Sequence, residues 1–227
     1  MKSHRMKSSE EFLILNGKGN VWTLEKLSQN NFLCKNLKSA PKLEPNIHLI
    51  MSPPVGDSLF ESVQQATEIG ATKISFIRTQ HCQYKKGKTP NFARLQRVIQ
   101  AACAQCARAW SVELSEDFVS LEKCLSSLDS TINFVADESL ATDETLPPSF
   151  CGPLQIALVK EKLKQCTEAR ISIIIGPEGG WSTEELKILK NKAVPLSLGS
   201  LILRVPTACV AAVFAVKQLW HSTRTAN

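Results

Sequence analysis

The sequence predicts an α/β fold with a parallel sheet, and two patterns carry that prediction. From residue 47 onward, short apolar runs alternate with longer segments of helical periodicity, and strands separated by helices pair in parallel. The clearest run, residues 171–175, reads Ile-Ser-Ile-Ile-Ile. It is too short and too apolar for a surface helix and is typical of a strand covered on both faces.

The N-terminal part of the chain predicts a β-hairpin. Asn16-Gly17 stands between the apolar runs 12–15 and 21–24, and Asn-Gly in this setting is a strong hairpin signal. A two-stranded ribbon is marginal by itself. We therefore expect a third strand at residues 32–37 and a small β domain around the hairpin.

A short linker is expected to separate this domain from the rest. Residues 39–46 have two prolines and no periodicity, so we expect them to join a β domain over residues 1–42 to an α/β domain over residues 46–225. Ser58-x-x-Glu61 is a capping-box pattern for a helix that ends at Gly70. The other elements expected before the last strands are strands at 47–51, 73–77 and 132–135, helices at 91–110 and 154–165, and a loop at 137–153.

Residues 176–180 form a glycine-rich loop directly after the buried strand. They hold three of the chain's ten glycines, and glycine admits positive φ and lets another molecule approach the backbone. Ser182 and Glu185 form a capping box, so a helix is expected to start right after the loop. A plain connecting turn is the alternative, but open α/β sheets bind ligands at the carboxyl ends of parallel strands. Pro177 and the lack of a following Gly-Lys do not fit the nucleotide-binding patterns, so we expect a ligand less anionic than a di- or triphosphate.

A second loop of the same kind follows the next strand. Residues 194–198 are expected to be that strand, residues 199–205 the loop, and Pro206 the first turn of a helix. Two such loops at neighbouring strand ends are expected to wall one pocket. The helix that follows, residues 207–220, is apolar nearly all round and must be buried on more than one side. The polar tail from His221 is expected to fray.

Composition bounds the class of protein. With 27 Lys and Arg against 21 Asp and Glu, the 227-residue chain has a net charge of +6, which favours an anionic partner. The basic N-terminus lacks the apolar stretch of a signal peptide, and no apolar run approaches a transmembrane length, so a cytoplasmic location is expected. Reduced thiols are expected for the eight cysteines. Cys103-x-x-Cys106 has no second pair, and the four histidines are scattered, so no metal is expected.

Two stretches of the sequence carry a resemblance to a known family. Ile175-Gly-Pro-Glu-Gly-Gly180 followed by Ser-x-x-Glu, and Leu198-Gly-x-x-Ile-Leu-Arg204 followed by x-x-Thr-Ala, resemble the ribosomal RNA small-subunit methyltransferase E family. Members of this family are uridine N3-specific enzymes of the SPOUT class. The resemblance implies a deep trefoil knot that binds S-adenosylmethionine, a PUA-like RNA-binding β-barrel at the N-terminus, here truncated, and a homodimer formed through the last helix. The implied reaction is methylation of N3 of a uridine in small-subunit (16S) ribosomal RNA.

The chemistry of that reaction selects candidate site residues. Arg204 is the first choice and Arg108 the second for stabilising a deprotonated uridine, and a structural ion pair is the alternative for each. Glu178 either contacts the methyl donor or caps its own loop. The residues expected to bind S-adenosylmethionine are Ile175, Gly176, Pro177, Glu178, Gly179, Gly180, Leu198, Gly199, Ile202, Leu203 and Thr207. Those expected to contact RNA are Arg5, Lys7, Lys18, Arg78, Lys85 and Lys86.

The chain departs from the family pattern at several positions. Gln80 and His81 stand where the family has Arg-Ser, Ser200 and Leu201 where it has Pro-Arg, and Pro206 replaces a glutamate. Two alternatives therefore stay open. One is an RNA-binding or ribosome-assembly protein that has lost catalysis, and the other is a methyltransferase for another RNA such as tRNA.

Overall fold

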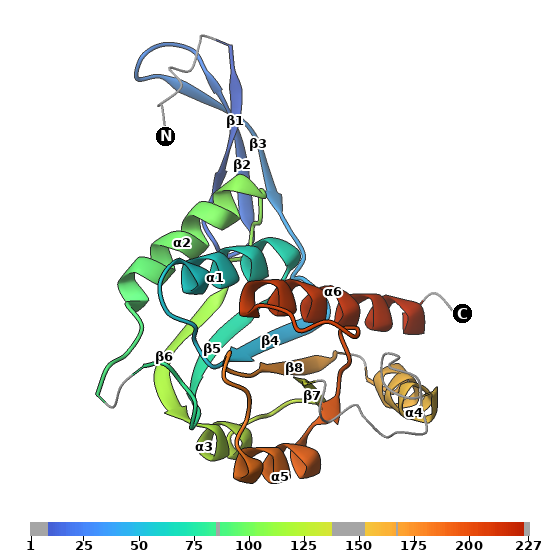
Figure 1. The fold of residues 1–227 in the computed structure, drawn as a ribbon. Coiled ribbons are helices and arrows are strands. Elements are labelled where there is room, and N and C mark those ends of the chain that lie inside the picture. Colours follow the sequence, from blue (N-terminus) through green and yellow to red (C-terminus); the bar gives the residue numbers. More distant parts are fainter. Residues whose placement is uncertain (1–8, 85–86, 138–152, 167, 225–227) are drawn as a thin grey trace.

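The chain folds around a six-stranded parallel sheet, and a separate three-stranded sheet stands at its N-terminal end (Figure 1). The computed structural model describes residues 9–84, 87–137, 153–166 and 168–224. All strand pairs of the large sheet are parallel, so the predicted α/β class is confirmed. In spatial order its strands are β6 (Glu113–Ser120), β5 (Lys73–Arg78), β4 (Asn46–Met51), β8 (Arg170–Ile175), β7 (Ile132–Ala136) and β9 (Val194–Pro195).

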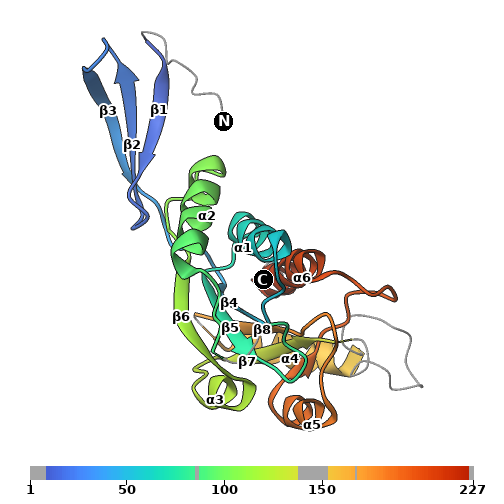
Figure 2. The ribbon, with the colours of Figure 1, turned by 60° about the vertical axis from the view of Figure 1, so that its left-hand side comes forward.

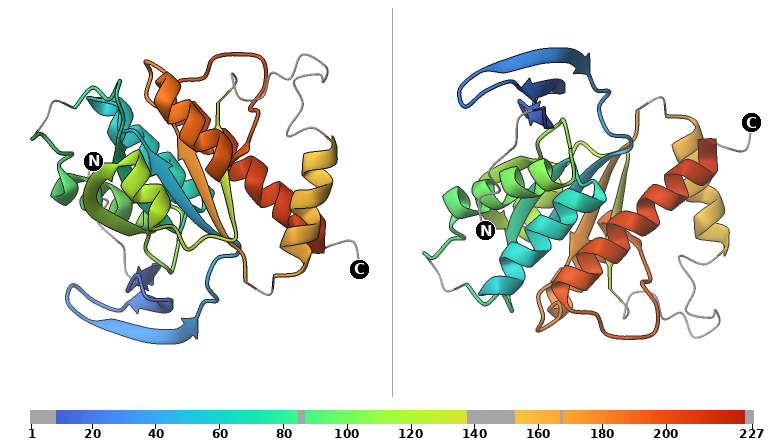
Figure 3. Two further views of the ribbon diagram at one scale, coloured as in Figure 1. Left: turned by 90° about the horizontal axis from the view of Figure 1, so that it is seen from below. Right: turned by 90° about the horizontal axis from the view of Figure 1, so that it is seen from above.

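Helices cover both faces of this sheet, as the two views of Figure 3 show. On one face lie α1 (Asp57–Ile69), α2 (Phe92–Gln105) and α6 (Val205–Arg224), with α4 (Pro153–Lys164) packed against α6. The other face carries the two short helices α3 (Leu121–Ser126) and α5 (Thr183–Lys192). Although α6 is long and apolar, no helix within the described residues combines the length and apolarity needed to cross a membrane.

The central strand β8 shows why the sheet is buried on both sides. Ile171, Ile173 and Ile175 join the apolar cluster under α1, α2 and α6, whereas Ile174 joins the cluster under α3 and α5. Successive side chains of a strand point to opposite faces, so this largely apolar run contributes to both layers. The prediction of a strand covered on both faces is confirmed.

The last third of the chain passes from one face of the sheet to the other. Leu189 of α5 packs in one apolar cluster and Cys209 of α6 in the other. The intervening residues 193–204 include β9, which pairs with β7 at the edge of the sheet. The chain therefore crosses beside the carboxyl ends of β7 and β8.

The N-terminal sheet confirms the predicted hairpin and its third strand. β1 (Glu11–Leu15), β2 (Asn20–Lys26) and β3 (Phe32–Ser39) pair antiparallel in sequence order. In the turn, the Asn16 side-chain oxygen accepts hydrogen bonds from the backbone N–H groups of Lys18 and Asn20, at 2.8 and 3.0 Å. Within the described residues this sheet has three strands and is not closed into a barrel.

A small contact joins the N-terminal sheet to the α/β domain below it (Figure 2). The Gly19 N–H donates to the Ala109 carbonyl at 3.0 Å, and the Trp110 indole N–H donates to the Ala40 carbonyl at 2.8 Å. A Cβ at Gly19 would fall 2.5 Å from the Trp110 ring. Glycine at this position therefore lets the hairpin turn approach the segment after α2.

Two helix boundaries differ from the prediction. α1 starts at Asp57 with Gly56 as its N-cap, and Ser58 lies inside the helix, where its carbonyl accepts from the Ser62 hydroxyl at 2.7 Å. The Ser58 capping box is therefore wrong. α2 is predicted to reach residue 110 but ends at Gln105, because Ala107 has a left-handed φ of 54° that a helix cannot accommodate.

The remaining differences concern β6, α3, β9 and the C-terminus. β6 and α3 are absent from the prediction, because the sequence Glu-Leu-Ser-Glu-Asp-Phe-Val-Ser is polar and forms an edge strand. β9 has two residues rather than five. The predicted frayed tail is wrong over residues 221–224, since α6 continues through them: Thr223 is buried and the Arg224 guanidinium stacks on Trp220 at 4.1 Å. The helix expected at 154–165 is confirmed, and the loop expected at 137–153 lies almost wholly outside the described residues.

Candidate functional site

The loops that follow β8 and β9 line one cavity at the carboxyl end of the sheet. Its volume is about 270 Å³. The end of β7 contributes a third wall through Ala136 and Asp137. The lining residues are Ala136, Asp137, Ile175, Gly176, Pro177, Glu178, Gly180, Trp181, Leu196, Leu198, Gly199, Leu201, Ile202, Leu203, Val205 and Ala208. The expectation that two glycine loops wall one pocket is met.

Glycine is required in these loops for two different reasons. Gly180 and Gly199 have φ values of 72° and 111°, a region that residues with a Cβ rarely occupy. Gly176 has no such φ, but a Cβ there would lie 2.8 Å from the Trp181 indole. Backbone conformation therefore favours glycine at positions 180 and 199, and close packing favours it at position 176.

A buried carboxylate holds the first loop at the start of α5. Glu185 is 6% exposed, and its two oxygens accept from the backbone N–H groups of Ser182 and Gln80, both at 2.9 Å. The Ser182 hydroxyl accepts in return from the Glu185 N–H at 3.2 Å. The predicted capping box is confirmed, and it also ties the loop after β5 to the loop after β8.

Most of the residues expected to bind a cofactor lie together. Nine of the eleven line the cavity, and Gly179 and Thr207 do not. Gly179 instead packs against His81: a Cβ added at Gly179 would lie 3.1 Å from the His81 Cβ. Thr207 lines a groove between α1 and α6 instead.

Several residues that line the cavity are absent from the binding residues predicted from the sequence. Trp181 is 8% exposed and packs over Gly176, and its place between the glycine loop and the capping box is a signal that would have found it. Ala136 and Asp137 follow the β7 strand, and no motif marks them. Leu196, Leu201, Val205 and Ala208 belong to the second loop and the first turns of α6.

The two candidate catalytic arginines lie in different environments. Arg204 is exposed between two cavity-lining residues, and its carbonyl accepts from the Ala208 N–H at 2.9 Å as α6 begins. In the part of the chain that the structure describes, its side chain forms no hydrogen bond or ion pair.

Arg108 is buried and lies outside the cavity. Its guanidinium donates to the carbonyls of Thr67 and Trp110, both at 2.7 Å, and burial lowers its pKa. Its position just beyond α2 joins the end of α1 to the segment that contacts the N-terminal sheet. The structure therefore does not bring Arg108 together with Arg204.

The expected RNA-contacting residues are only partly described. Arg5, Lys7, Lys85 and Lys86 lie outside the described residues, and Lys18 sits in the hairpin turn beside Trp110. Arg78 donates to the carbonyls of Tyr84 and Lys88, both at 2.9 Å, and stacks on Phe118 at 4.2 Å. Its guanidinium thus organises the loop after β5.

A second cavity, of about 530 Å³, lies at the opposite end of the strands and is lined by His48, Ser75 and several charged residues. The His48 Nε2 is 2.8 Å from the Ser75 hydroxyl. Burial, with a smaller contribution from the Lys73 charge, lowers the pKa of His48 to about 4. The Lys73 and Glu113 side chains form an ion pair at 2.6 Å. Among the described residues, no group of three or more His, Cys, Asp or Glu side chains is placed to hold a metal.

Together, the fold and the site define an α/β domain with a cavity at the carboxyl ends of its parallel strands. Residues 41–217 match the RNA methyltransferase domain family, and the chain belongs to that family.

Individual proteins of known name are also similar to this chain. The chain is 28% identical over 223 residues to the ribosomal RNA small subunit methyltransferase E of Synechocystis sp., covering 96% of this chain and 69% of that protein. It is 26% identical over 222 residues to the protein of the same name from Rickettsia conorii, covering 95% and 83%. Among solved structures, the ribosomal RNA small subunit methyltransferase E of Neisseria gonorrhoeae bound to S-adenosyl methionine superposes with a TM-score of 0.72 at 22% identity, covering 95% of this chain and 86% of that one. That last likeness establishes the shared fold.

Proposed function

We propose that the chain is an S-adenosylmethionine-dependent methyltransferase that methylates N3 of a uridine in small-subunit (16S) ribosomal RNA. The observation that carries the proposal is the single cavity formed by both glycine loops in a member of an RNA methyltransferase family. The names of the relatives from Synechocystis and Rickettsia support ribosomal RNA as the substrate. The uridine N3 target follows from the resemblance of the two loop sequences.

The residues around the cavity fit S-adenosylmethionine. Leu198, Ile202 and Leu203 supply an apolar wall, and the backbone of the glycine loops offers hydrogen-bonding groups free of side chains. The Glu178 carboxylate adds a negative charge at the wall, which suits a ligand that carries a sulfonium and an ammonium group. When bound, this cofactor supplies a methyl group on a positively charged sulfur.

Arg204 is the residue we propose for stabilising the base. Transfer of a methyl group to N3 requires that N3 lose its proton, which passes to solvent, and that the negative charge left on the uridine be stabilised. Arg204 is exposed, borders the cavity and has no hydrogen-bonding or charged partner among the described residues, so its charge is available. Arg108 is assigned a structural role because its guanidinium is buried and bonded to two carbonyls.

We further propose the SPOUT class with its trefoil knot, and the division into residues 1–42 and 46–225. The crossing of residues 193–204 from the face of α5 to the face of α6, beside the ends of β7 and β8, supports a knot. The three-stranded sheet with its exposed β3 supports a PUA-like RNA-binding domain. The RNA-contacting role of Arg5, Lys7, Lys18, Arg78, Lys85 and Lys86 belongs to this proposal, as does a cytoplasmic location.

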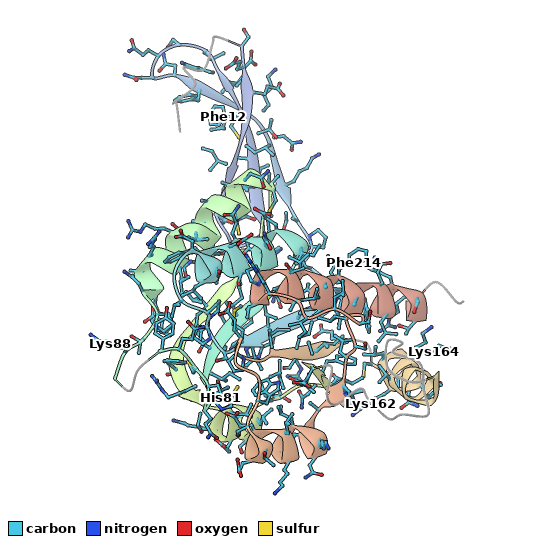
Figure 4. The ribbon with its side chains drawn as sticks, viewed as in Figure 1. Phe12, His81, Lys88, Lys162, Lys164 and Phe214 are labelled. Atoms are coloured by element: carbon cyan, nitrogen blue, oxygen red, sulfur yellow. The ribbon has the colours of Figure 1, made fainter. Side chains whose placement is uncertain are left out.

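A homodimer through α6 is also proposed. An apolar groove between α1 and α6 is lined by Ile69, Val210, Ala211 and Phe214. Phe214 is 52% exposed and lies on the outer side of α6 (Figure 4). Covering an exposed aromatic side chain of this kind stabilises an interface. Sedimentation of the wild type and of Phe214→Glu tests it, with a dimer expected only for the wild type.

Mass spectrometry of modified nucleosides tests the function. Small-subunit rRNA, large-subunit rRNA and tRNA are compared between cells with and without the gene, and loss of N3-methyluridine from small-subunit rRNA alone is the expected result. Loss from tRNA instead would favour a methyltransferase for another RNA. Unchanged N3-methyluridine in every RNA, together with retained rRNA binding, would favour the non-catalytic alternative, which the departures at Gln80, Leu201 and Pro206 motivate.

A further inference from the structure

The loop between β5 and α2 forms two hydrogen-bonding contacts with the glycine loop after β8 and a third with the first turn of α5. The Gln80 N–H donates to the Glu185 carboxylate at 2.9 Å, the His81 Nδ1 lies 2.9 Å from the Gly180 carbonyl, and the Gln83 amide donates to the Glu178 carboxylate at 2.8 Å. These bonds join residues 95 to 105 positions apart in the chain. Figure 4 shows His81 at this end of the sheet, near the start of α5.

Two of the residues held by these contacts line the cavity. Glu178 and Gly180 line the cavity, whereas His81 and Gln83 do not. Because a carbonyl oxygen only accepts, the His81 Nδ1 carries the proton in this contact, and it does so in the matching neutral tautomer as well as in the imidazolium. The bond therefore does not depend on the charge of His81.

Packing reinforces these hydrogen bonds. A Cβ at Gly179 would lie 3.1 Å from the His81 Cβ, so the Gly179 backbone packs closely against His81. A loop with glycines at 176, 179 and 180 is intrinsically free to change conformation. The loop after β5 supplies contacts that restrict it to one arrangement.

We propose that His81 and Gln83 are positioning residues for the methyl donor, which rests on the function proposed above. They hold the Gly180 backbone and the Glu178 carboxylate at the cavity wall before the donor arrives. A loop already held in its binding conformation loses less conformational entropy on binding, so affinity rises.

Isothermal titration with S-adenosylmethionine tests the proposal. His81→Ala removes one donor and Gln83→Met removes the other while keeping side-chain length. Each is expected to weaken binding about threefold to tenfold, the range for losing one hydrogen bond of this kind. His81→Asn, whose amide N–H takes the place of Nδ1, is expected to restore most of the affinity.

Gln64→Ala is the matched control. Gln64 donates to Glu68 at 3.0 Å on the exposed side of α1, and neither residue lines the cavity. An equivalent Gln–Glu bond is therefore lost outside the cavity, and affinity is expected to stay at the wild-type value. Thermal unfolding of each variant, with a Tm close to that of the wild type, shows that the fold is intact.

The outcomes separate this inference from the proposed function. Wild-type affinity in both His81→Ala and Gln83→Met overturns the inference and leaves the function standing. Loss of affinity in His81→Ala that His81→Asn does not recover also overturns it, because the effect then comes from general disruption of the loop. Absence of any binding to the wild-type protein overturns both.

Discussion

The indole of Trp181 lies against Gly176, so closely that a Cβ at position 176 would be 2.8 Å from the ring. Trp181 is buried and lines the cavity together with Gly176. We expect Gly176→Ala to displace the indole and to lower the free energy of unfolding by about 1–3 kcal/mol, as overpacking does. Donor affinity, measured by titration, is expected to fall with it. Unchanged stability and affinity would show that the ring moves aside at no cost.

The conformation of the second loop provides a test with an internal control. Gly199 and Gly87 have φ values of 111° and 80°, and neither has an atom within 4 Å of an added Cβ. Alanine at either site is expected to cost about 1–2 kcal/mol of stability, since only conformational strain is introduced. Only Gly199→Ala is expected to weaken donor binding, by about fivefold to thirtyfold if the loop relaxes from its binding conformation. Equal donor affinity in Gly199→Ala and Gly87→Ala would show that the loop at Gly199 does not take part in donor binding.

Arg204 is expected to act on the reaction rather than on stability. Arg204→Ala should lower kcat by roughly a hundredfold, the scale for losing one stabilising group at a developing negative charge. The Kd for S-adenosylmethionine and the Tm should stay at their wild-type values, because the side chain is exposed. Arg204→Lys keeps the positive charge and should recover part of kcat. Steady-state methylation of RNA with both substrates saturating measures kcat, and an unchanged kcat in Arg204→Ala would contradict the assignment.

Arg108 should behave in the opposite way. Arg108→Ala leaves the carbonyls of Thr67 and Trp110 without their donors, and loss of two such bonds is expected to lower the free energy of unfolding by about 2–4 kcal/mol. Denaturant titration measures this change. The rate per folded molecule should be unchanged, and a large loss of kcat at wild-type stability would restore a catalytic role for Arg108.

His48 is expected to make stability depend on pH. Its pKa in the folded state is lowered to about 4 from an ordinary value of 6.5. The unfolded chain therefore binds more protons than the folded one between these values, and stability falls as the pH is lowered through that window. At pH 5 the loss relative to pH 7 is about 2 kcal/mol. His48→Gln, which can still bond to Ser75, should remove this component, and an identical pH profile in the variant would refute the assignment.

Local rules determined much of this protein from the sequence alone. Asn16-Gly17 specified the hairpin turn, the run 171–175 specified a doubly covered strand, and the Ser182–Glu185 box specified the start of α5. Each depends on neighbours within a few residues, or on a side-chain period that any strand or helix must obey. For the same reason the two glycine loops are recognisable as candidate binding loops from their residues alone.

Only the tertiary structure decided the features that depend on distant partners. α2 stops at Gln105 where the chain turns to meet the N-terminal sheet, β6 forms at the edge despite its polar sequence, and α6 continues to Arg224, with Thr223 buried and Arg224 stacked on Trp220. The same long-range packing takes Arg108 away from the cavity and brings His81 and Gln83 to the glycine loop. Sequence patterns report what a segment prefers, whereas contacts between segments about a hundred residues apart arise only when burial of the shared apolar surface brings them together.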